Sequence, residues 1–476
     1  HHINIKEGKS PIKLRYYKTN KVKSDVLKEQ IIKLIDKGLI EPSSSEWSFP
    51  VVLVPKHNND WRMCVDYRKL NDITVPDSYS LPYIDEIFDN LGGATIFTTL
   101  DLFSGYHQIL MDDDSIDKTC FTTKFGNFVF KVMPFGLCNA PATFQREMNK
   151  IFFDLIGVCV HIFLDDVLIY SKCKEDHVIH INLVLDILEK FDLKINIEKC
   201  QFMREEVHVL GHVIFKKGLK TDDKKVNVIK NWDVPTNIGE LRSFLGAIGY
   251  YRKFIDQFAQ KSAPLTNLLR KGVKYNIKED QMKSFIILKE CLISAPILMF
   301  PEYTKRFIIR TDASRKGIGG VLLQEADDKL EHPIHFVSRS LSKAENNYGI
   351  TDLEGTAVHY CVKQFKYYIE GNPFETIVYT DHKPLVGLFK NKEPTNGRHA
   401  RWCIDLSMLR VVVKYEPGKK NSLADSLSRL TNKNEGKISM LVYNRIKCNE
   451  IMNEKYRLME NMNIDNKLME NNNDKN

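Results

Sequence analysis

The sequence lacks the features that mark membrane proteins, disulfide-bonded secreted proteins and zinc-binding proteins. No apolar run approaches the roughly 18 residues of a membrane-spanning helix. Its ten cysteines stand singly, with no C-x-x-C pair, so neither a zinc site nor a disulfide framework is indicated. The opening "HHINIKEGKS" contains neither an initiating Met nor the apolar core of a signal peptide. We therefore expect an intracellular, cytoplasmic protein with reduced thiols and no membrane contact, cut from a longer chain.

The composition is that of an ordinary globular protein, with a small excess of positive charge. Hydrophobic residues make up 43% and charged residues 27% of the 476 residues. At roughly 150 residues per domain, this length suggests several packed units. Lys and Arg outnumber Asp and Glu by 69 to 61, a net charge of +8. Such an excess permits a polyanionic partner without requiring one.

Hydrophobic patterning divides the chain into four parts. Short strand patterns separated by helical stretches predict an α+β unit over residues 1–216, and the pattern then becomes helical over 217–305. A second alternation of strands and helices predicts an α/β domain over 306–430. The tail, 431–476, is rich in Asn, Lys, Glu and Met without sustained periodicity, and we expect it to be disordered.

The stretch "HIFLDDVLIY" sets Asp165 and Asp166 side by side between two apolar runs. Two unit charges about 4 Å apart repel by about 4 kcal/mol at an effective dielectric of about 20. A hairpin turn is the simplest interpretation, because Asp favours turn geometry. A second possibility involves Asp101, which closes another apolar run, "TIFTTLD". If the two strands lie side by side, three carboxylates converge, and divalent cations such as magnesium would be needed to stabilise them.

Several motifs together resemble those of a known family. "WRMCVDYRKLN", "LDLFSGYHQI", "MPFGLCNAPATFQ", "FLDDVLIYS" and "LGHVI" occur in the order found in reverse transcriptases of gypsy-like LTR retrotransposons and retroviruses. The resemblance extends from His1 to Leu430. It implies a right-hand polymerase, with fingers and palm over 1–216 and thumb and connection helices over 217–305, followed by a ribonuclease H-like domain over 306–430.

This resemblance assigns roles at the first acidic cluster. Asp101 and Asp165 would be the principal metal ligands and Asp166 an assisting one. Tyr106 would be an aromatic gate, whose ring collides with a ribose 2′-hydroxyl and so favours deoxynucleotides. A plain core aromatic is the alternative for Tyr106.

The resemblance also assigns residues to the incoming nucleotide. Lys56 and Arg62 would hold its triphosphate, consistent with charge-assisted contacts to phosphate. A solvated charged turn is the alternative for both. Phe135 and Gly136 in "MPFGL" would pack beneath the nucleotide.

A second acidic set resembles the ribonuclease H site of the same elements. Asp312 and Asp381 end strand patterns, Glu354 lies near a helix start, and Asp425 follows in "SLADSLSR". All four would bind metal ions and serve hydrolysis of an RNA phosphodiester. Glu354 has an alternative role, because Thr351 and Glu354 also fit the capping box T-x-x-E.

The resemblance implies an RNA-directed and DNA-directed DNA polymerase with ribonuclease H activity, serving retroelement replication. Expected partners are an RNA template, a DNA primer and product, an RNA/DNA hybrid and deoxynucleoside triphosphates. A homodimer or polyprotein neighbours are further candidate partners. The expected cofactor is Mg²⁺, two ions per site, with Mn²⁺ as the alternative. An active element would place the protein in a virus-like particle.

Two rival hypotheses remain at this point. One is a decayed or domesticated copy that binds nucleic acid without catalysis, and the other is a structural subunit. The presence of all seven acids favours the enzyme.

Overall fold

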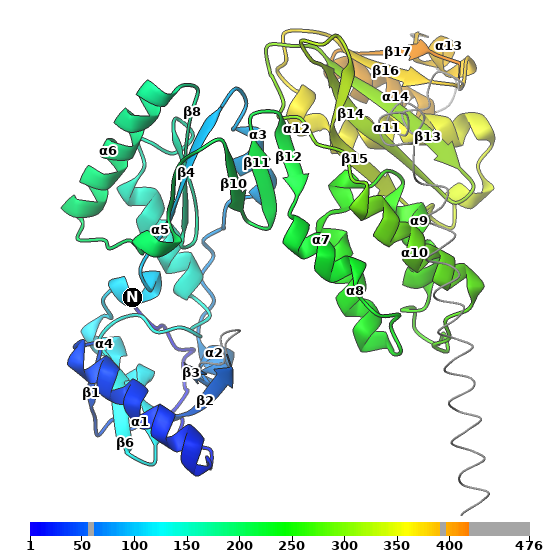
Figure 1. Cartoon of the computed structure of the whole chain (residues 1–476). Helices are drawn as coiled ribbons and strands as arrows, with labels where there is room; N and C mark the ends of the chain where they lie inside the picture. The colour runs from blue at the N-terminus through cyan, green and yellow to red at the C-terminus, as the bar shows by residue number, and fades with distance from the viewer. Residues whose placement is uncertain (56–60, 391–396, 418–476) are drawn as a thin grey trace, which may run out of the picture.

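The computed structural model describes residues 1–55, 61–390 and 397–417 (Figure 1). Lys56, Asp425 and the tail 431–476 lie outside the described residues, so what the sequence predicts for them stays a prediction. The strands of the described ranges form four sheets. None of the helices in these ranges combines the length and the apolar character that crossing a bilayer would require.

The first sheet has the strand order β1-β6-β5-β2-β3. Helix α1 (Lys21–Asp36) covers it with a stripe that includes Leu27 and Ile31, both buried. The strands are β1 (Ile40–Pro42), β2 (Phe49–Pro55), β3 (Trp61–Val65), β5 (Phe121–Thr123) and β6 (Gly126–Phe130). The connections hold the short helices α2 (Arg68–Ile73) and α4 (Asp113–Ile116).

The second sheet carries the first acidic cluster and is antiparallel, in the order β7-β8-β4-β9. Strand β8 is buried on both faces, which explains its unbroken apolar run. Val167 and Ile169 join one hydrophobic core, and Leu168 and Tyr170 join another. The elements are α3 (Ile84–Asp89), β4 (Ile96–Asp101), α5 (Ala140–Ile151), β7 (Val160–Phe163), β8 (Asp166–Ser171), α6 (Lys174–Lys190) and β9 (Gln201–Arg204).

A small antiparallel sheet and a group of helices follow. Strands β10 (Glu206–Val209), β11 (His212–Phe215) and β12 (Gly218–Thr221) form one sheet that runs across residue 216. In Figure 1 this sheet lies between the part that holds β4 and β8 and the part that holds the next helices. These helices are α7 (Asp223–Lys230), α8 (Ile238–Tyr250), α9 (Phe258–Asn267) and α10 (Glu279–Ile293).

The last sheet has the order β15-β14-β13-β16-β17. Strands β13, β14 and β15 pair antiparallel, whereas β16 pairs in parallel with both β13 and β17. The strands are β13 (Phe307–Ser314), β14 (Gly317–Glu325), β15 (Glu331–Arg339), β16 (Thr376–Thr380) and β17 (Val411–Tyr415). The helices are α11 (Ile350–Gln364), α12 (Lys366–Ile369), α13 (Pro384–Lys390) and α14 (Gly397–Met408).

The two faces of the last sheet belong to different cores. Ile309 and Leu322 pack with α11 inside the domain. Ile308, Val321 and Phe336 instead join the core that also contains buried residues of α8 and α10. The helical segment is therefore packed directly onto the outer face of this sheet.

Candidate active sites

The first acidic cluster lies where three strand ends meet. Strands β4 and β8 lie side by side, with Asp101 directly opposite Asp166 in the antiparallel register. Residues directly opposite in such a pair have Cβ atoms about 5 Å apart and point to the same face. Asp165 and the preceding residue, Leu164, form the two-residue turn between β7 and β8. The stretch "HIFLDDVLIY" is thus a hairpin, and its turn brings Asp165 and Asp166 to the end of β4.

The electrostatics of this cluster call for a cation. Burial, followed by the charges of Asp166 and Asp101, raises the pKa of Asp165 to about 6. Partial desolvation, followed by the charge of Asp101, also raises the pKa of Asp166, whose side chain is still exposed to solvent. Oδ1 of Asp165 is buried and has no hydrogen-bond partner among the described residues. Such an unpartnered, partly desolvated carboxylate oxygen fits a divalent-cation ligand, and the pKa shifts are of the kind that cluster at functional sites.

A lysine already lies against one of these acids. Nζ of Lys199, at the end of the 3-10 helix η3 (Ile197–Lys199), lies 3.1 Å and 3.3 Å from the two carboxylate oxygens of Asp101. Lys199 also lowers the pKa of Asp165, against the larger effects that raise it. Within the described ranges, no set of three or more His, Cys, Asp or Glu side chains is arranged as a complete metal site. The three carboxylates of the first cluster therefore lie close together, and the ammonium group of Lys199 contacts Asp101.

Two residues that no sequence pattern points to, Gln145 and Gly105, shape the Asp165 turn. Gln145 on α5 is fully buried, and its Oε1 accepts a hydrogen bond from the backbone N of Leu164 at 2.8 Å. Its Nε2 donates to the backbone O of Ile162 at 3.1 Å. Leu164 has φ +54°, a left-handed conformation that a residue other than glycine rarely adopts. On the other side is Gly105, where a Cβ atom would lie 2.6 Å from Oδ1 of Asp165.

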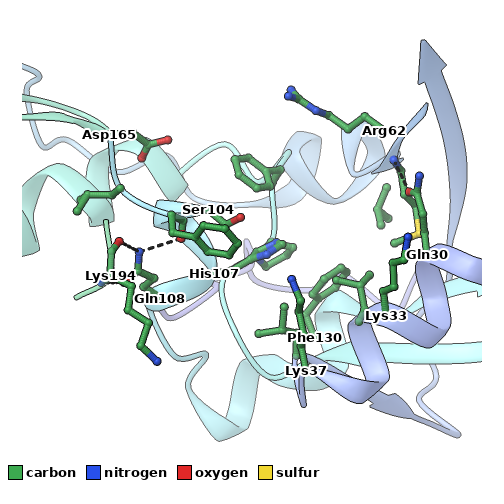
Figure 2. A pocket seen from close by; sticks show the side chains of 18 of the residues that line it. Gln30, Lys33, Lys37, Arg62, Ser104, His107, Gln108, Phe130, Asp165 and Lys194 are labelled. Atoms are coloured by element: carbon green, nitrogen blue, oxygen red, sulfur yellow. Dashed lines mark hydrogen bonds between the residues drawn. The ribbon is translucent and has the colours of Figure 1, made fainter. Parts of the chain in front are cut away.

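A cleft of about 920 Å³ opens in front of this turn. Asp101, Asp165, Arg62 and Phe135 are among its lining residues, whereas Asp166, Tyr106 and Gly136 are not part of the lining found in the described ranges. Figure 2 shows Asp165 on one side of the cleft and Arg62 on the opposite side. The lining also includes four lysines that no sequence motif singles out: Lys33, Lys37, Lys194 and Lys199.

Tyr106 packs next to the cleft lining. Its ring packs against those of Phe135 and Phe144, with centroids 5.1 Å and 5.5 Å away. Burial and the nearby charge of Asp165 raise the pKa of Tyr106. Phe135 is 44% exposed, and Gly136 adopts φ +100°. Tyr106 is therefore held by aromatic packing and also lies beside the acidic cluster.

The second acidic cluster forms at one edge of the last sheet. Asp312 lies near the end of β13, and Asp381 directly follows β16, which is parallel to β13. Glu354 on α11 is only 5% exposed. Burial, then Asp381, then Asp312 raise the pKa of Glu354 to about 8. Partial burial and the charges of Asp256 and Asp381 raise the pKa of Asp312. Three of the four predicted acids therefore interact, and the fourth, Asp425, is not among the described residues.

Glu354 does not cap its helix. Helix α11 begins at Ile350 after Gly349, and no side chain caps its first turn. Thr351 instead shares a hydrogen bond of 2.8 Å between its Oγ1 and Nε2 of His382. Oε2 of Glu354 is buried without a hydrogen-bond partner in the part of the chain described. The capping-box alternative is therefore wrong, and the unpartnered oxygen fits a cation ligand.

Comparison with known proteins gives matches to both parts of the chain. Residues 54–214 match the family model described as reverse transcriptase (RNA-dependent DNA polymerase), and residues 302–409 match an RNase H-like domain found in reverse transcriptase. The chain is 39% identical over 435 residues to the retrovirus-related Pol polyprotein from transposon 297 of Drosophila melanogaster, covering 90% of this chain and 40% of that protein. It is 35% identical over 436 residues to the transposon Tf2-3 polyprotein of Schizosaccharomyces pombe, covering 91% and 33%. The chain thus spans about two fifths or less of the length of these relatives.

Solved structures show the same fold. The foamy viral protease-reverse transcriptase in complex with double-stranded DNA has a TM-score of 0.75 and 22% identity, with 87% of this chain and 87% of that chain covered. The same protein in complex with an RNA/DNA hybrid has a TM-score of 0.69 and 22% identity, with 87% and 56% covered. These likenesses confirm the predicted fold class, a right-hand polymerase followed by a ribonuclease H-like domain.

Proposed function

Because the chain belongs to the retrovirus-related Pol polyproteins of transposons, as their reverse transcriptase and ribonuclease H region, we propose that it copies RNA and then DNA into DNA and degrades the copied RNA. The family predicted from the sequence is thereby confirmed. One observation carries the proposal of two activities: each domain gathers acids around a buried carboxylate oxygen without a hydrogen-bond partner in the described ranges, on Asp165 in one and Glu354 in the other.

Divalent cations would be held at both clusters. Asp101, Asp165 and Asp166 would hold them in the polymerase site, and Asp312, Glu354 and Asp381, with Asp425, in the ribonuclease H site. Magnesium, with manganese as the alternative, would activate the attacking hydroxyl or water and stabilise the leaving oxygen, with two ions per site.

The polymerase cleft would position a primer and a deoxynucleoside triphosphate. Arg62 faces Asp165 across the cleft and would hold the triphosphate together with Lys56. The rings of Phe135 and Phe144 pack against Tyr106, and this packing supports a role as a steric gate against a 2′-hydroxyl. Phe135, exposed on the cleft, would form with Gly136 the surface beneath the nucleotide. Lys199 would hold Asp101 in place before substrate arrives.

In the ribonuclease H site, Glu354 would hold a proton at neutral pH until cation binding removes it, since its pKa is about 8.

We assign residues 1–216 to fingers and palm, 217–305 to thumb and connection, and 306–430 to ribonuclease H. An RNA template, a DNA primer and an RNA/DNA hybrid are the proposed partners. The basic cleft supports these nucleic-acid partners. The likeness to a protein solved with double-stranded DNA and with an RNA/DNA hybrid supports them too. We also propose that the protein is located in the cytoplasm, within a virus-like particle if the element is active. A homodimer and polyprotein neighbours are further proposed partners.

The test is magnesium-dependent primer extension on a labelled RNA template, with RNA fragments measured in the same tube. Asp165→Asn should abolish extension and leave RNA cleavage in a preformed hybrid intact. Glu354→Gln should have the opposite effect. Each variant is the control for the other, because both must fold to retain one activity. A wild-type chain that binds primer-template but neither extends nor cleaves would instead support a copy that binds without catalysis.

A further inference from the structure

A turn from the helical segment reaches the ribonuclease H site. It lies between the 3-10 helix η4 (Arg252–Phe254) and α9, and it contains Gln257. Nε2 of Gln257 donates a hydrogen bond of 2.7 Å to Oδ2 of Asp312. Gln257 precedes Asp312 by 55 residues and lies outside the stretch 302–409 that matches the RNase H-like family. A residue from the polymerase side of the chain therefore contacts an acid of the second site.

The same turn is fixed firmly against the last sheet. The backbone N of Ala259 donates to Oγ of Ser338 on β15 at 2.9 Å. Gln260 packs against Gly317 at the start of β14, where an added Cβ atom would lie 3.0 Å from the Gln260 side chain. Gln257 itself has φ +48°, in the left-handed region. Such a conformation in a residue other than glycine persists only where the surrounding contacts determine it.

We propose that Gln257 is a positioning residue of the ribonuclease H site, fixing the Asp312 carboxylate for a divalent cation. This inference rests on the proposed function. A carboxylate that binds a metal is usually held by a further hydrogen bond, and loss of that partner lowers metal affinity or activity by about 10–100-fold. Without the amide, the Asp312 carboxylate would lose its side-chain partner and keep only its backbone hydrogen bond from Ala313. The site is then complete only when the helical segment is packed on the sheet.

The variant Gln257→Gly distinguishes the effect of the side-chain amide from the effect of the backbone turn. Glycine adopts positive φ without strain, so the turn is kept while the hydrogen bond is lost. Lys329→Gly is the matched control, because Lys329 is also left-handed, with φ +61°, and is exposed away from this site. Gln257→Glu is a second variant, which places a negative charge against Asp312. Primer extension by the same chains reports whether they fold.

The measurements are kcat and KM for RNA cleavage in a hybrid, the half-saturating Mg²⁺ concentration, and Mn²⁺ binding without nucleic acid, followed by water-proton relaxation. For Gln257→Gly we expect kcat to fall, or the Mg²⁺ requirement to rise, by at least about 10-fold with KM unchanged. Mn²⁺ binding should weaken at the sites that Asp312→Asn removes. Gln257→Glu should be impaired at least as much, whereas Lys329→Gly should match the wild type.

Two other results would overturn the inference, in distinguishable ways. Wild-type cleavage and Mn²⁺ binding in Gln257→Gly, or a change in KM alone, would show that Gln257 does not position Asp312. A wild-type chain that neither cleaves the hybrid nor binds Mn²⁺ at the Asp312 sites would refute the proposed function, and the inference with it.

Discussion

Replacing Gln145 by Met should disable the polymerase site without touching its acids. Met has nearly the same length as Gln but can neither accept from Leu164 N nor donate to Ile162 O, the bonds of 2.8 Å and 3.1 Å that fix the turn. Each buried backbone group left without a partner costs about 1–3 kcal/mol. The expected loss of unfolding free energy is therefore about 2–4 kcal/mol, somewhat less than two full penalties, because the Leu164 bond is only partly buried.

The loss of activity should exceed what this destabilisation explains. Leu164 would be released from its left-handed conformation, and Asp165 would move with it. A displacement of about 1 Å at reacting groups can lower the rate by about 100-fold. Single-turnover primer extension should therefore fall by about 10–100-fold at a temperature where the variant is folded.

The assay includes its own controls. RNA cleavage by the same chain should stay within about twofold of wild type, because Gln145 lies in the polymerase part. Gln364→Met makes the same chemical change at an exposed helical glutamine and should alter stability by no more than about 0.5 kcal/mol. Wild-type extension by folded Gln145→Met would refute the argument that Gln145 positions the turn.

Three further outcomes are expected. Gly105→Ala should reduce extension but spare RNA cleavage, because its Cβ would lie 2.6 Å from Oδ1 of Asp165; unchanged extension would mean that the turn can shift freely. In metal-free protein, Glu354 has a folded pKa of about 8, above its ordinary value of 4.5, so its contribution to stability is fully present below pH 4.5 and is lost progressively as pH rises from there through about 8. Denaturant unfolding should show this loss, which Glu354→Gln should remove; an identical pH dependence in the variant would contradict the assignment. Affinity for primer-template should fall with salt, at a slope of about −0.9 per phosphate contact on duplex DNA; a flat profile would argue against the basic cleft.

Much of both sites could be predicted because their acids end recognisable strands. Asp101 ends one apolar run and Asp166 begins another, and the two runs pair in one sheet. Asp312 and Asp381 lie at the carboxyl ends of strands that are parallel neighbours. Glu354 could not be decided, since a cap and a ligand share the same spacing in the sequence. The fold decides it: the first turn of α11 has no side-chain cap, and Oε2 of Glu354 is buried beside the other acids.

The residues that support the acids escaped prediction altogether. Gln145 ends a recognised motif, yet nothing in the motif says that its amide holds the turn at Leu164. Lys199 and Gln257 contact their aspartates across 98 and 55 residues of chain. A side-chain amide or ammonium has no periodic pattern of its own, so only the folded arrangement reveals its partner.

The sequence by itself determined the strands, the Asp165 turn and the kinds of side chain at the strand ends, because periodicity and turn preference act over a few residues. The tertiary structure decided which of these ends meet and how deeply each acid is buried. Burial and neighbouring charge then set the pKa of Asp165 near 6 and that of Glu354 near 8. Both pKa shifts depend on distances between segments that are far apart in the chain, and so they arise only when the chain has folded.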